Sequence, residues 1–328
     1  MRQACGSSRV RVTSRDITIA VRVKSHFSLT GGLRMALPAE FKAHAGPVWS
    51  LAFSPDGSLL ATTGHDRNVN LWNVADGKPA RAITAHNEPI VAVRFSPDGK
   101  ILASCSADGL IRLWNPADGK QIRELRGHSD TVNCICFSGD GKALISGGRD
   151  KTVRIWDVAG KTPPKPLAGH EGTVFALALA PDGKTVASGS QDTGIRLWDL
   201  AAGTPVKSLP GSEDAVVALA FGKDGKLLYS GGMDKQIRVW DVAAGKQVKQ
   251  WTDHPDFVLA LALHPDGNRL VSAGYGGNVL VWDLASGKVL LAKKLAVGAY
   301  TLAITPDKTA ILSGHENGFC YLTAMPPG

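Results

Sequence analysis

Three side chains that together could perform nucleophilic catalysis lie close to one another in the sequence: His170, Ser188 and Asp192. In a serine hydrolase the serine attacks, the histidine removes its proton, and the aspartate orients the histidine. A monomeric enzyme needs one such set, whereas this chain repeats the same residue types several times at a constant spacing. Because a catalytic triad is defined by one unique geometry, the repetition favours a structural role for these residues.

The chain is built from copies of one unit. The first copy begins at His44 and reads HAGPVWSLAFSPDGSLLATTGHDRNVNLWN. Related copies follow at steps of 42 residues and begin at His86, His128, His170, Ser212 and His254. A tryptophan near the end of each copy keeps the same step: Trp72, Trp114, Trp156, Trp198, Trp240 and Trp282. A seventh, degraded copy reads AVGAYTLAITPDKTAILSGHENGFCYLTA, and a fixed period of this length indicates a repeat architecture.

Each copy contains four short segments of strand character. In the second copy they read IVAVRFS, ILASCSA, LIRLWN and KQIRELR, with the turns PDG and ADG between them. Segments of this length, rich in Val, Ile and Leu and bounded by turn residues, predict antiparallel strands. The turn at Pro97, Asp98 and Gly99 fits because proline presets φ, aspartate caps the backbone, and glycine accepts a left-handed conformation. No long 3.6-residue periodicity appears, so we expect an all-β chain with essentially no helix.

A recognisable motif marks both ends of the copies. Gly-His stands near the start, and Trp-Asp closes the third segment at 156–157, 198–199, 240–241 and 282–283, relaxed to Trp-Asn at 72–73 and 114–115. In these features the chain resembles the WD40 repeat family over about residues 37–325, with six strong copies out of seven. The resemblance implies a seven-bladed β-propeller with four antiparallel strands in each blade.

The resemblance also implies a role for the repeated polar residues. In WD40 blades a histidine of the leading loop, a Ser or Thr of the second strand, an Asp of the next turn and the Trp of the third strand form a hydrogen-bonded chain. The corresponding sets here are His44, Thr62, Asp66, Trp72; His86, Ser104, Asp108, Trp114; His128, Ser146, Asp150, Trp156; and His170, Ser188, Asp192, Trp198. Three copies depart from this pattern. The fifth has Ser212 for the histidine, the sixth has Gly276 for the aspartate, and the seventh has Asn317 for the aspartate, Thr323 for the tryptophan and no leading histidine.

The two ends of the repeat region complement each other. The seventh copy stops after its third strand, while residues 37–43 (LPAEFKA) occupy a fourth-strand position without three strands before them. We therefore expect residues 37–43 to complete the last blade, which would close a monomeric ring and limit open strand edges. The expected organisation is a basic leader at 1–36, with a translation start at Met35, a propeller at 37–325 and a tail at 326–328.

Charge and cysteine content narrow the possible functions. The net charge is +8, but residues 1–34 hold seven Lys and Arg against Asp16, so the propeller itself is nearly balanced. Nucleic acid is therefore expected to bind only through the leader, if at all. Neither a signal-peptide core nor a membrane-spanning apolar run occurs, which favours a cytoplasmic location. The pair Cys134 and Cys136 occupies slots that other copies fill with Ala or Ser, so we expect small core residues, and neither a cofactor nor a metal is expected.

The residues that remain after the repeat framework is removed indicate where function would lie. In WD40 proteins the residues three and five after the leading histidine, and the residue before the turn aspartate, line the top face around the central opening. We expect a partner-binding surface formed by Trp49, His65, Val91, Arg149, Phe175, Phe257, Leu259, Tyr275, Tyr300 and Glu316. Exposed apolar and aromatic residues of this kind usually mark interaction sites. The alternative is that the aromatic side chains only fill the mouth of the channel.

The sequence therefore favours a non-enzymatic scaffold that binds a protein or peptide on its top face. Two alternatives remain, namely a propeller hydrolase or lyase, and a regulatory module that acts beside an enzyme on another chain. His65, His315 and Glu316 are candidate metal ligands, but they are weak against the three or four ligands of typical protein zinc sites. No phosphate-binding G-x-x-x-x-G-K-[ST] loop occurs.

Overall fold

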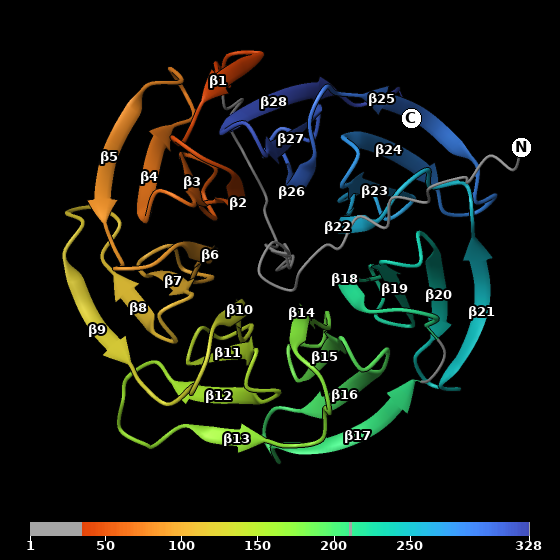
Figure 1. Cartoon of the computed structure of the whole chain (residues 1–328), viewed down its shortest axis with the longest axis horizontal. Coiled ribbons are helices and arrows are strands. Elements are labelled where there is room, and N and C mark those ends of the chain that lie inside the picture. Colours follow the sequence, from red (N-terminus) through yellow and green to blue (C-terminus); the bar gives the residue numbers. More distant parts are fainter. Residues whose placement is uncertain (1–34, 210–211, 328) are drawn as a thin grey trace, which may run out of the picture.

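Seven four-stranded antiparallel sheets stand around a central axis in the computed structural model, which describes residues 35–209 and 212–327 (Figure 1). Within the described residues every regular element is a strand, so the predicted all-β seven-bladed propeller is confirmed. Residues 1–34 of the leader expected at 1–36 lie outside the described part of the chain, while Met35 and Ala36 are described, and Ala36 N donates to Val74 O of blade 1 at 3.0 Å. Sheets arranged in a ring leave only short outer strands exposed.

The blades are numbered in chain order, and blade 7 combines both ends of the ring. The strands of blades 1 to 3 are β2 (Val48–Phe53), β3 (Leu59–Gly64), β4 (Asn68–Asn73), β5 (Pro79–Thr84); β6 (Ile90–Phe95), β7 (Leu102–Ser106), β8 (Ile111–Trp114), β9 (Gln121–Leu125); β10 (Val132–Phe137), β11 (Ala143–Gly148), β12 (Val153–Asp157) and β13 (Lys165–Leu167). Those of blades 4 and 5 are β14 (Val174–Leu179), β15 (Thr185–Ser190), β16 (Ile195–Asp199), β17 (Thr204–Leu209); β18 (Val216–Phe221), β19 (Leu227–Gly232), β20 (Ile237–Asp241) and β21 (Lys246–Trp251). Those of blades 6 and 7 are β22 (Val258–Leu263), β23 (Arg269–Gly274), β24 (Asn278–Asp283), β25 (Val289–Lys294); β26 (Ala299–Ile304), β27 (Ala310–His315), β28 (Phe319–Ala324) and β1 (Glu40–Lys42).

Burial decreases from the axis outward. The first strand of each blade lies nearest the axis, and β18 (VVALAF) is buried along its whole length (Figure 1). The fourth strand lies at the circumference, and β21 (KQVKQW) is exposed except for its final tryptophan. An inner strand needs apolar residues on both faces because neighbouring blades cover both faces. The first strands of adjacent blades pack against one another around the ring, and β26 packs against β2.

The ring closes as the sequence predicts. Strand β1 pairs antiparallel with β28, with Glu40 opposite Tyr321 and Lys42 opposite Phe319. Between them Phe41 packs against Trp72 of blade 1, with the ring centroids 4.8 Å apart. Blade 7 therefore draws its outer strand from the start of the repeat region and its three inner strands from the end (Figure 1).

Every blade carries a β-bulge at the start of its inner strand. The pairing between the first two strands skips one residue in each blade, and the skipped residues are Trp49, Val91, Asn133, Phe175, Val217, Leu259 and Tyr300. A bulge places an extra residue outside the regular alternation of the strand and re-aims its side chain. These residues, called the inner bulge residues below, stand five positions after the leading histidine. From the sequence, this position is expected on the top face.

A second bulge occurs in the outer strand of five blades. The pairing between the third and fourth strands skips Ala80, Ile122, Val206, Val248 and Leu290. Bulges on edge strands interrupt the row of free backbone groups and oppose pairing with another chain. These positions are called the outer bulge residues below.

The residue after the outer bulge slot joins neighbouring blades. Arg81 Nη2 donates to Ala117 O of blade 2 at 2.9 Å, and Lys249 Nζ donates to Ala285 O of blade 6 at 3.0 Å. Arg123 donates to Ala159 O in the same way, Lys165 to Ala202 O, and Lys207 to Ala243 O. These five contacts, called clasps below, run from blade 1 through blade 6. The equivalent residues of blades 6 and 7 are Leu291 and Ala39, whose side chains have no donor.

Candidate functional site

The hydroxyl of Ser188 is fully buried and lies in the middle of a hydrogen-bonded chain. Trp198 Nε1 donates to Ser188 Oγ at 2.7 Å, Ser188 Oγ lies 2.7 Å from His170 Nε2, and His170 Nδ1 lies 2.9 Å from Asp192 Oδ2. A nucleophile must be reachable by a substrate, whereas Ser188 is 0% exposed. This set of four residues therefore connects the second and third strands of blade 4 to its leading loop.

The structure brings the same four residue types together in blades 1, 2 and 3. The distance from histidine Nδ1 to the aspartate oxygen is 2.8 Å in blade 1, 3.0 Å in blade 2 and 2.8 Å in blade 3. The distance from Nε2 to the Thr or Ser hydroxyl is 2.9, 2.8 and 2.7 Å in the same order. The indole donor completes each chain: Trp72 to Thr62, Trp114 to Ser104, and Trp156 to Ser146.

Burial and hydrogen bonding together set the charges in these chains. Burial disfavours the charged form of Asp108, but the hydrogen bonds from His86, Leu110 and Arg112 outweigh it and hold the pKa of Asp108 at about 2. Burial lowers the pKa of His170, although the carboxylate of Asp192 opposes the change. A neutral His170 donates from Nδ1 to Asp192 and accepts from Ser188 at Nε2. Both ring nitrogens of His170 are therefore paired within this hydrogen-bonded set.

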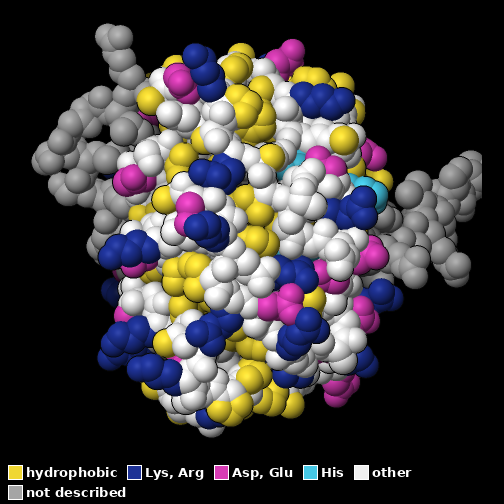
Figure 2. All heavy atoms as spheres, turned by 90° about the vertical axis from the view of Figure 1, so that its left-hand side faces the viewer, with side chains coloured by type: hydrophobic (Ala, Val, Ile, Leu, Met, Phe, Trp, Pro, Cys, Tyr) yellow, Lys and Arg dark blue, Asp and Glu magenta, His cyan; other side chains and the backbone are white. Residues whose placement is uncertain are grey.

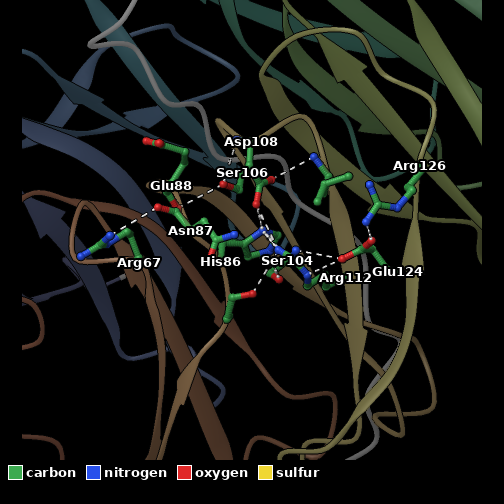
Figure 3. Close-up of polar contacts among 12 residues, drawn as sticks. Arg67, His86, Asn87, Glu88, Ser104, Ser106, Asp108, Arg112, Glu124 and Arg126 are labelled. Atoms are coloured by element: carbon green, nitrogen blue, oxygen red, sulfur yellow. Dashed lines mark hydrogen bonds and ion pairs between the residues drawn. The ribbon is translucent and has the colours of Figure 1, made fainter.

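Blade 2 extends its chain toward the circumference (Figure 3). Arg112 Nη1 donates to Asp108 Oδ2 at 3.0 Å, and Arg112 Nε donates to Glu124 Oε2 of the outer strand at 2.9 Å. Arg126 forms a further ion pair with Glu124. The network therefore reaches from the leading loop to β9.

Blades 5 and 6, which each lack a member of the set, form other polar contacts near the vacant position. In blade 5, Ser212 Oγ donates to Asp234 Oδ2 at 3.0 Å, and the buried Arg238 forms hydrogen bonds with both residues. In blade 6, the carboxylate of Asp256 accepts from Asn278 Nδ2 at 2.5 Å, and the Asp256 carbonyl accepts from His254 Nδ1 at 2.6 Å. His254 Nε2 has no hydrogen-bond partner among the described residues, so the chain of blade 6 does not reach Ser272.

Blade 7 replaces its histidine with His315. His315 Nε2 lies 2.8 Å from Ser313 Oγ, the serine of the second strand, and Nδ1 donates to Val297 O at 3.0 Å. The equivalent residue in blade 1 is Gly64, where a Cβ atom would approach the His44 ring at 3.2 Å. A side chain at this slot therefore enters the space that the leading histidine occupies in other blades. The sequence analysis treated His315 as a candidate metal ligand, but both of its ring nitrogens are engaged and the residue is fully buried.

The ten residues expected to bind a partner divide into two groups. Five of them are at most 8% exposed: Trp49, Val91, Phe175, Leu259 and Tyr300. All five belong to one core cluster that also contains residues of blades 2 to 6. The remaining five are accessible, with Phe257 and Tyr275 half-buried and His65, Arg149 and Glu316 exposed.

The buried group consists entirely of inner bulge residues. From the sequence, Trp49, Leu259, Phe257 and Tyr300 are expected to belong to an exposed partner-binding surface. In the structure only Phe257 of these four is substantially accessible, because the inner bulges place the other three in the core. This burial is the arrangement expected when such side chains fill the mouth of a channel.

Three aromatic side chains form a row on blades 6 and 7, in which Phe257 and Tyr275 are accessible and Tyr300 is buried. The ring centroids of Phe257 and Tyr275 are 6.2 Å apart, and those of Tyr275 and Tyr300 are 6.3 Å apart. Lys235, from the turn between β19 and β20, places its Nζ 5.9 Å from the centroid of Phe257. Sequence reasoning missed Lys235, because this slot follows the turn aspartate and lies outside the three slots considered. We call Phe257, Tyr275, Tyr300 and Lys235 the aromatic row.

Two other accessible residues lie on different blades, His65 on blade 1 and Arg149 on blade 3. His65 of blade 1 packs edge-on against Trp49, with centroids 5.7 Å apart. Arg149 of blade 3 lies 3.7 Å from the carboxylate of Asp130. Across residues 35–209 and 212–327, no three His, Cys, Asp or Glu side chains lie together in a way that could hold a metal ion. The same residues include no helix that is long and apolar enough to cross a membrane.

A family model described as WD domain, G-beta repeat matches six consecutive segments, at residues 36–73, 77–115, 119–157, 161–199, 203–241 and 245–283. Telomerase protein component 1 of Rattus norvegicus is 56% identical over 36 residues, which are 11% of this chain and 1% of that protein. Telomerase protein component 1 of Mus musculus is 34% identical over 73 residues, 22% of this chain and 3% of that protein. The chain thus covers only a small fraction of these relatives, and the similarity lies within fewer than two 42-residue repeats.

Proposed function

The chain belongs to the WD40 repeat family, and from this premise we propose that it is a non-enzymatic scaffold that binds a protein or peptide on its top face. A rigid ring that holds loops from seven blades around one opening suits this role. The fold alone hosts many functions, so the site has to carry the proposal.

The observation that carries the proposal is the aromatic row of blades 6 and 7. Phe257 and Tyr275 are half-buried rather than covered, while most bulky residues around the opening are in the core. Aromatic side chains that are held by neighbours and yet accessible are typical anchors of protein interfaces. They offer a large contact area at a small cost in side-chain entropy.

The charges beside the row indicate what the partner presents. Lys235 lies over Phe257, and Arg149 stands on blade 3, across the opening. A ligand with an apolar side chain for the row and a nearby carboxylate would satisfy both features, because lysine and arginine form charge-assisted hydrogen bonds with carboxylates. We therefore infer that the partner is a peptide or loop with an apolar anchor next to an acidic residue.

The buried bulge residues support this surface from below. Tyr300 packs against Tyr275, and Trp49 packs against His65, so each of these two buried aromatic side chains supports an accessible ring. Their role in the proposal is to fix the orientation of the contact residues rather than to touch the partner.

An enzymatic function is less well supported. The repeated serine and threonine hydroxyls of the hydrogen-bonded chains are buried and already paired. A regulatory module beside an enzyme on another chain would use the same binding surface, so it is a special case of the scaffold. The local similarity to telomerase protein component 1 concerns the repeat and gives no reason to transfer that protein's assembly.

The test measures partner affinity after changes in the aromatic row. The immobilised chain captures partners from a cell lysate, and the dissociation constant of the identified partner is measured for wild type, Phe257→Ala and Tyr275→Ala. A true anchor costs at least about 2 kcal/mol when truncated, which corresponds to an affinity loss of about 30-fold. Gln191→Ala is the matched control, because Gln191 occupies the slot of Tyr275 on blade 4 and is exposed. Wild-type affinity in both aromatic variants, with normal melting curves, would mean that the partner binds elsewhere.

A further inference from the structure

The large hydrophobic side chains that are exposed on the described part of the chain occupy one repeated position. They are Ile122, Val206, Val248 and Leu290, with exposed fractions of 50%, 57%, 51% and 47%. Each is the outer bulge residue of its blade. A single exposed apolar residue needs no explanation, but the concentration of all four in one slot does.

Protection of the strand edge does not explain why these residues are apolar. The bulge itself interrupts the edge, whatever side chain it carries, and lysine or another charged residue is the usual choice at protected edges. Val206, Val248 and Leu290 instead expose branched aliphatic side chains on three consecutive blades. This arrangement exposes apolar area to water that the interruption of the strand edge does not require.

The clasps connect the neighbouring blades that carry these three positions along the circumference. Lys207, directly after Val206, reaches Ala243 O in the turn that leads to Val248. Lys249, directly after Val248, reaches Ala285 O in the turn that leads to Leu290. Figure 1 shows β17, β21 and β25 following one another along the outside of the ring. The path therefore alternates apolar bulge residues with lysine side chains.

The three outer strands of this wall carry only positive charges, while Asp283 at the end of the adjoining strand β24 lies near Lys249. Strands β17, β21 and β25 contain Lys207, Lys246, Lys249, Lys293 and Lys294 and no Asp or Glu. On the opposite side of the ring, β9 has Glu124, which pairs with Arg112 and Arg126. The outer wall of blades 1 and 2 accordingly displays acidic and basic side chains next to one another (Figure 2).

We propose that the outer wall of blades 4 to 6 is a second docking surface, and that its partner is an extended acidic segment of another protein with aliphatic side chains. Carboxylates would face the lysines, and the aliphatic side chains would cover Val206, Val248 and Leu290. The wall is convex, because successive blades turn around the axis (Figure 1). A flat anionic membrane could touch only one blade closely, whereas an extended segment can follow the curve.

The probe is a synthetic peptide in which glutamate and leucine alternate, a pattern that favours an extended strand. Its binding to the full chain is measured by fluorescence anisotropy. The matching peptide with lysine in place of glutamate is the charge control, and phosphatidylserine vesicles are the membrane control. We expect the acidic peptide to bind, with an affinity that falls as salt increases, and we expect no binding of the lysine peptide.

Two sets of variants locate the site. The triple variant Val206→Ser, Val248→Ser and Leu290→Ser, and the double variant Lys246→Gln and Lys293→Gln, should each weaken binding at least about tenfold, or about 1.4 kcal/mol. Ile122→Ser is the matched control, since it changes the same slot on blade 2, and it should leave the affinity unchanged. Melting curves of all variants show whether the ring is intact.

Three results would overturn the proposal. The first is the absence of acidic-peptide binding to the wild-type chain at about millimolar concentration. The second is an equal loss of affinity in Ile122→Ser and in the triple variant, which would indicate non-specific association. The third is vesicle binding that is as sensitive to the triple variant as peptide binding, which would assign the wall to a membrane.

Discussion

Ser188 illustrates how residue types that catalyse in one setting only hold structure in another. Its hydroxyl accepts from Trp198 and donates to His170, so its proton is already used, and burial keeps a substrate away from the remaining lone pair. In blade 7 the same serine slot is served by His315, which comes from the second strand and not from the leading loop. The requirement is a ring nitrogen beside the buried hydroxyl, and two different backbone positions can supply it.

His315 predicts a specific dependence of stability on pH. Burial lowers the pKa of His315 to about 4, although its hydrogen bonds to backbone carbonyls oppose the change. Between about pH 6.5 and pH 4 the unfolded chain therefore binds a proton that the folded chain does not, and stability decreases as the pH falls through this range. The contribution is about 3 kcal/mol at most, from the size of the pKa change. His315→Gln should make the free energy of unfolding less sensitive to pH, as measured by urea titrations at pH 7 and pH 5.

The control for this experiment is His65→Gln, which removes an exposed histidine from the same face. Burial also lowers the pKa of His170 and His254, so the wild-type pH dependence is a sum over several groups. The informative quantity is the difference between the His315 variant and wild type. Identical pH dependence in the two proteins would refute the assignment.

At the scale of elements, the turn between the second and third strands needs a left-handed residue in every blade. Three blades place glycine there, at Gly109, Gly277 and Gly318. The other four place Arg67, Lys151, Thr193 and Lys235 at φ between 65° and 68°. The left-handed region is unfavourable for side chains with a Cβ atom, and most unfavourable for a β-branched residue such as threonine.

Exchange of residues at this turn should change stability in opposite directions. Thr193→Gly should stabilise the chain by about 1 kcal/mol, because the relief of backbone strain exceeds the entropy that glycine adds to the unfolded state. Gly109→Thr should destabilise it, since φ there is +76° and a Cβ atom would lie 3.3 Å from Asp130 O. Chemical denaturation of both variants provides the measurement. A loss of stability in Thr193→Gly would show that the threonine side chain contributes more than its strained backbone costs.

The bulges show what sequence reasoning could and could not provide for the site. The resemblance to WD40 repeats placed Trp49, Phe257 and Tyr300 near the opening. It could not tell which of them are covered, since burial follows the β-bulge, which only the pairing of the first two strands reveals. Phe257 remains accessible and Trp49 does not, although both are large and aromatic.

At the scale of the whole molecule, the repeat text predicted the fold nearly completely. Seven copies, four strands in each and a missing last strand left one arrangement that closes, and the pairing of β1 with β28 confirms it. The contacts around the missing members in blades 6 and 7 were not predictable. Asp256 and His315 lie outside the slots of the pattern, and only the folded ring brings them beside Asn278 and Ser313.

Removal of the closing strand should expose an open edge on blade 7. A chain that begins at Met35 retains Glu40–Lys42 and should melt at the same temperature as the full chain. A chain that begins at His44 lacks this strand, leaves β28 unpaired on its outer side, and should aggregate on heating. Differential scanning calorimetry and light scattering test this prediction. Equal melting and equal scattering of the two shortened chains would contradict a closing role for β1.

Blade 7 also lacks the clasps that link blades 1 to 6, because Leu291 and Ala39 replace the basic residue on either side of it. Blades 1 to 6 are thus joined to one another by five hydrogen bonds between their outer elements. Blade 7 is linked to its neighbours by other contacts, since Arg269 Nη1 of blade 6 donates to Pro326 O at 2.6 Å and Phe41 packs against Trp72 of blade 1.

The pairing of β1 with β28 imposes a delay during synthesis. Lys42 emerges from the ribosome long before Phe319, and at about 5–20 residues per second the interval is about 15–60 seconds. Throughout that time the closing strand has no partner and could pair with a neighbouring nascent chain. The strand has only three residues, and its two charged side chains, Glu40 and Lys42, are exposed on either side of Phe41. Both features oppose pairing with another chain during this interval. A short charged strand is a poor template for another chain, so the segment that must wait longest in the cell is also the one least able to recruit the wrong partner.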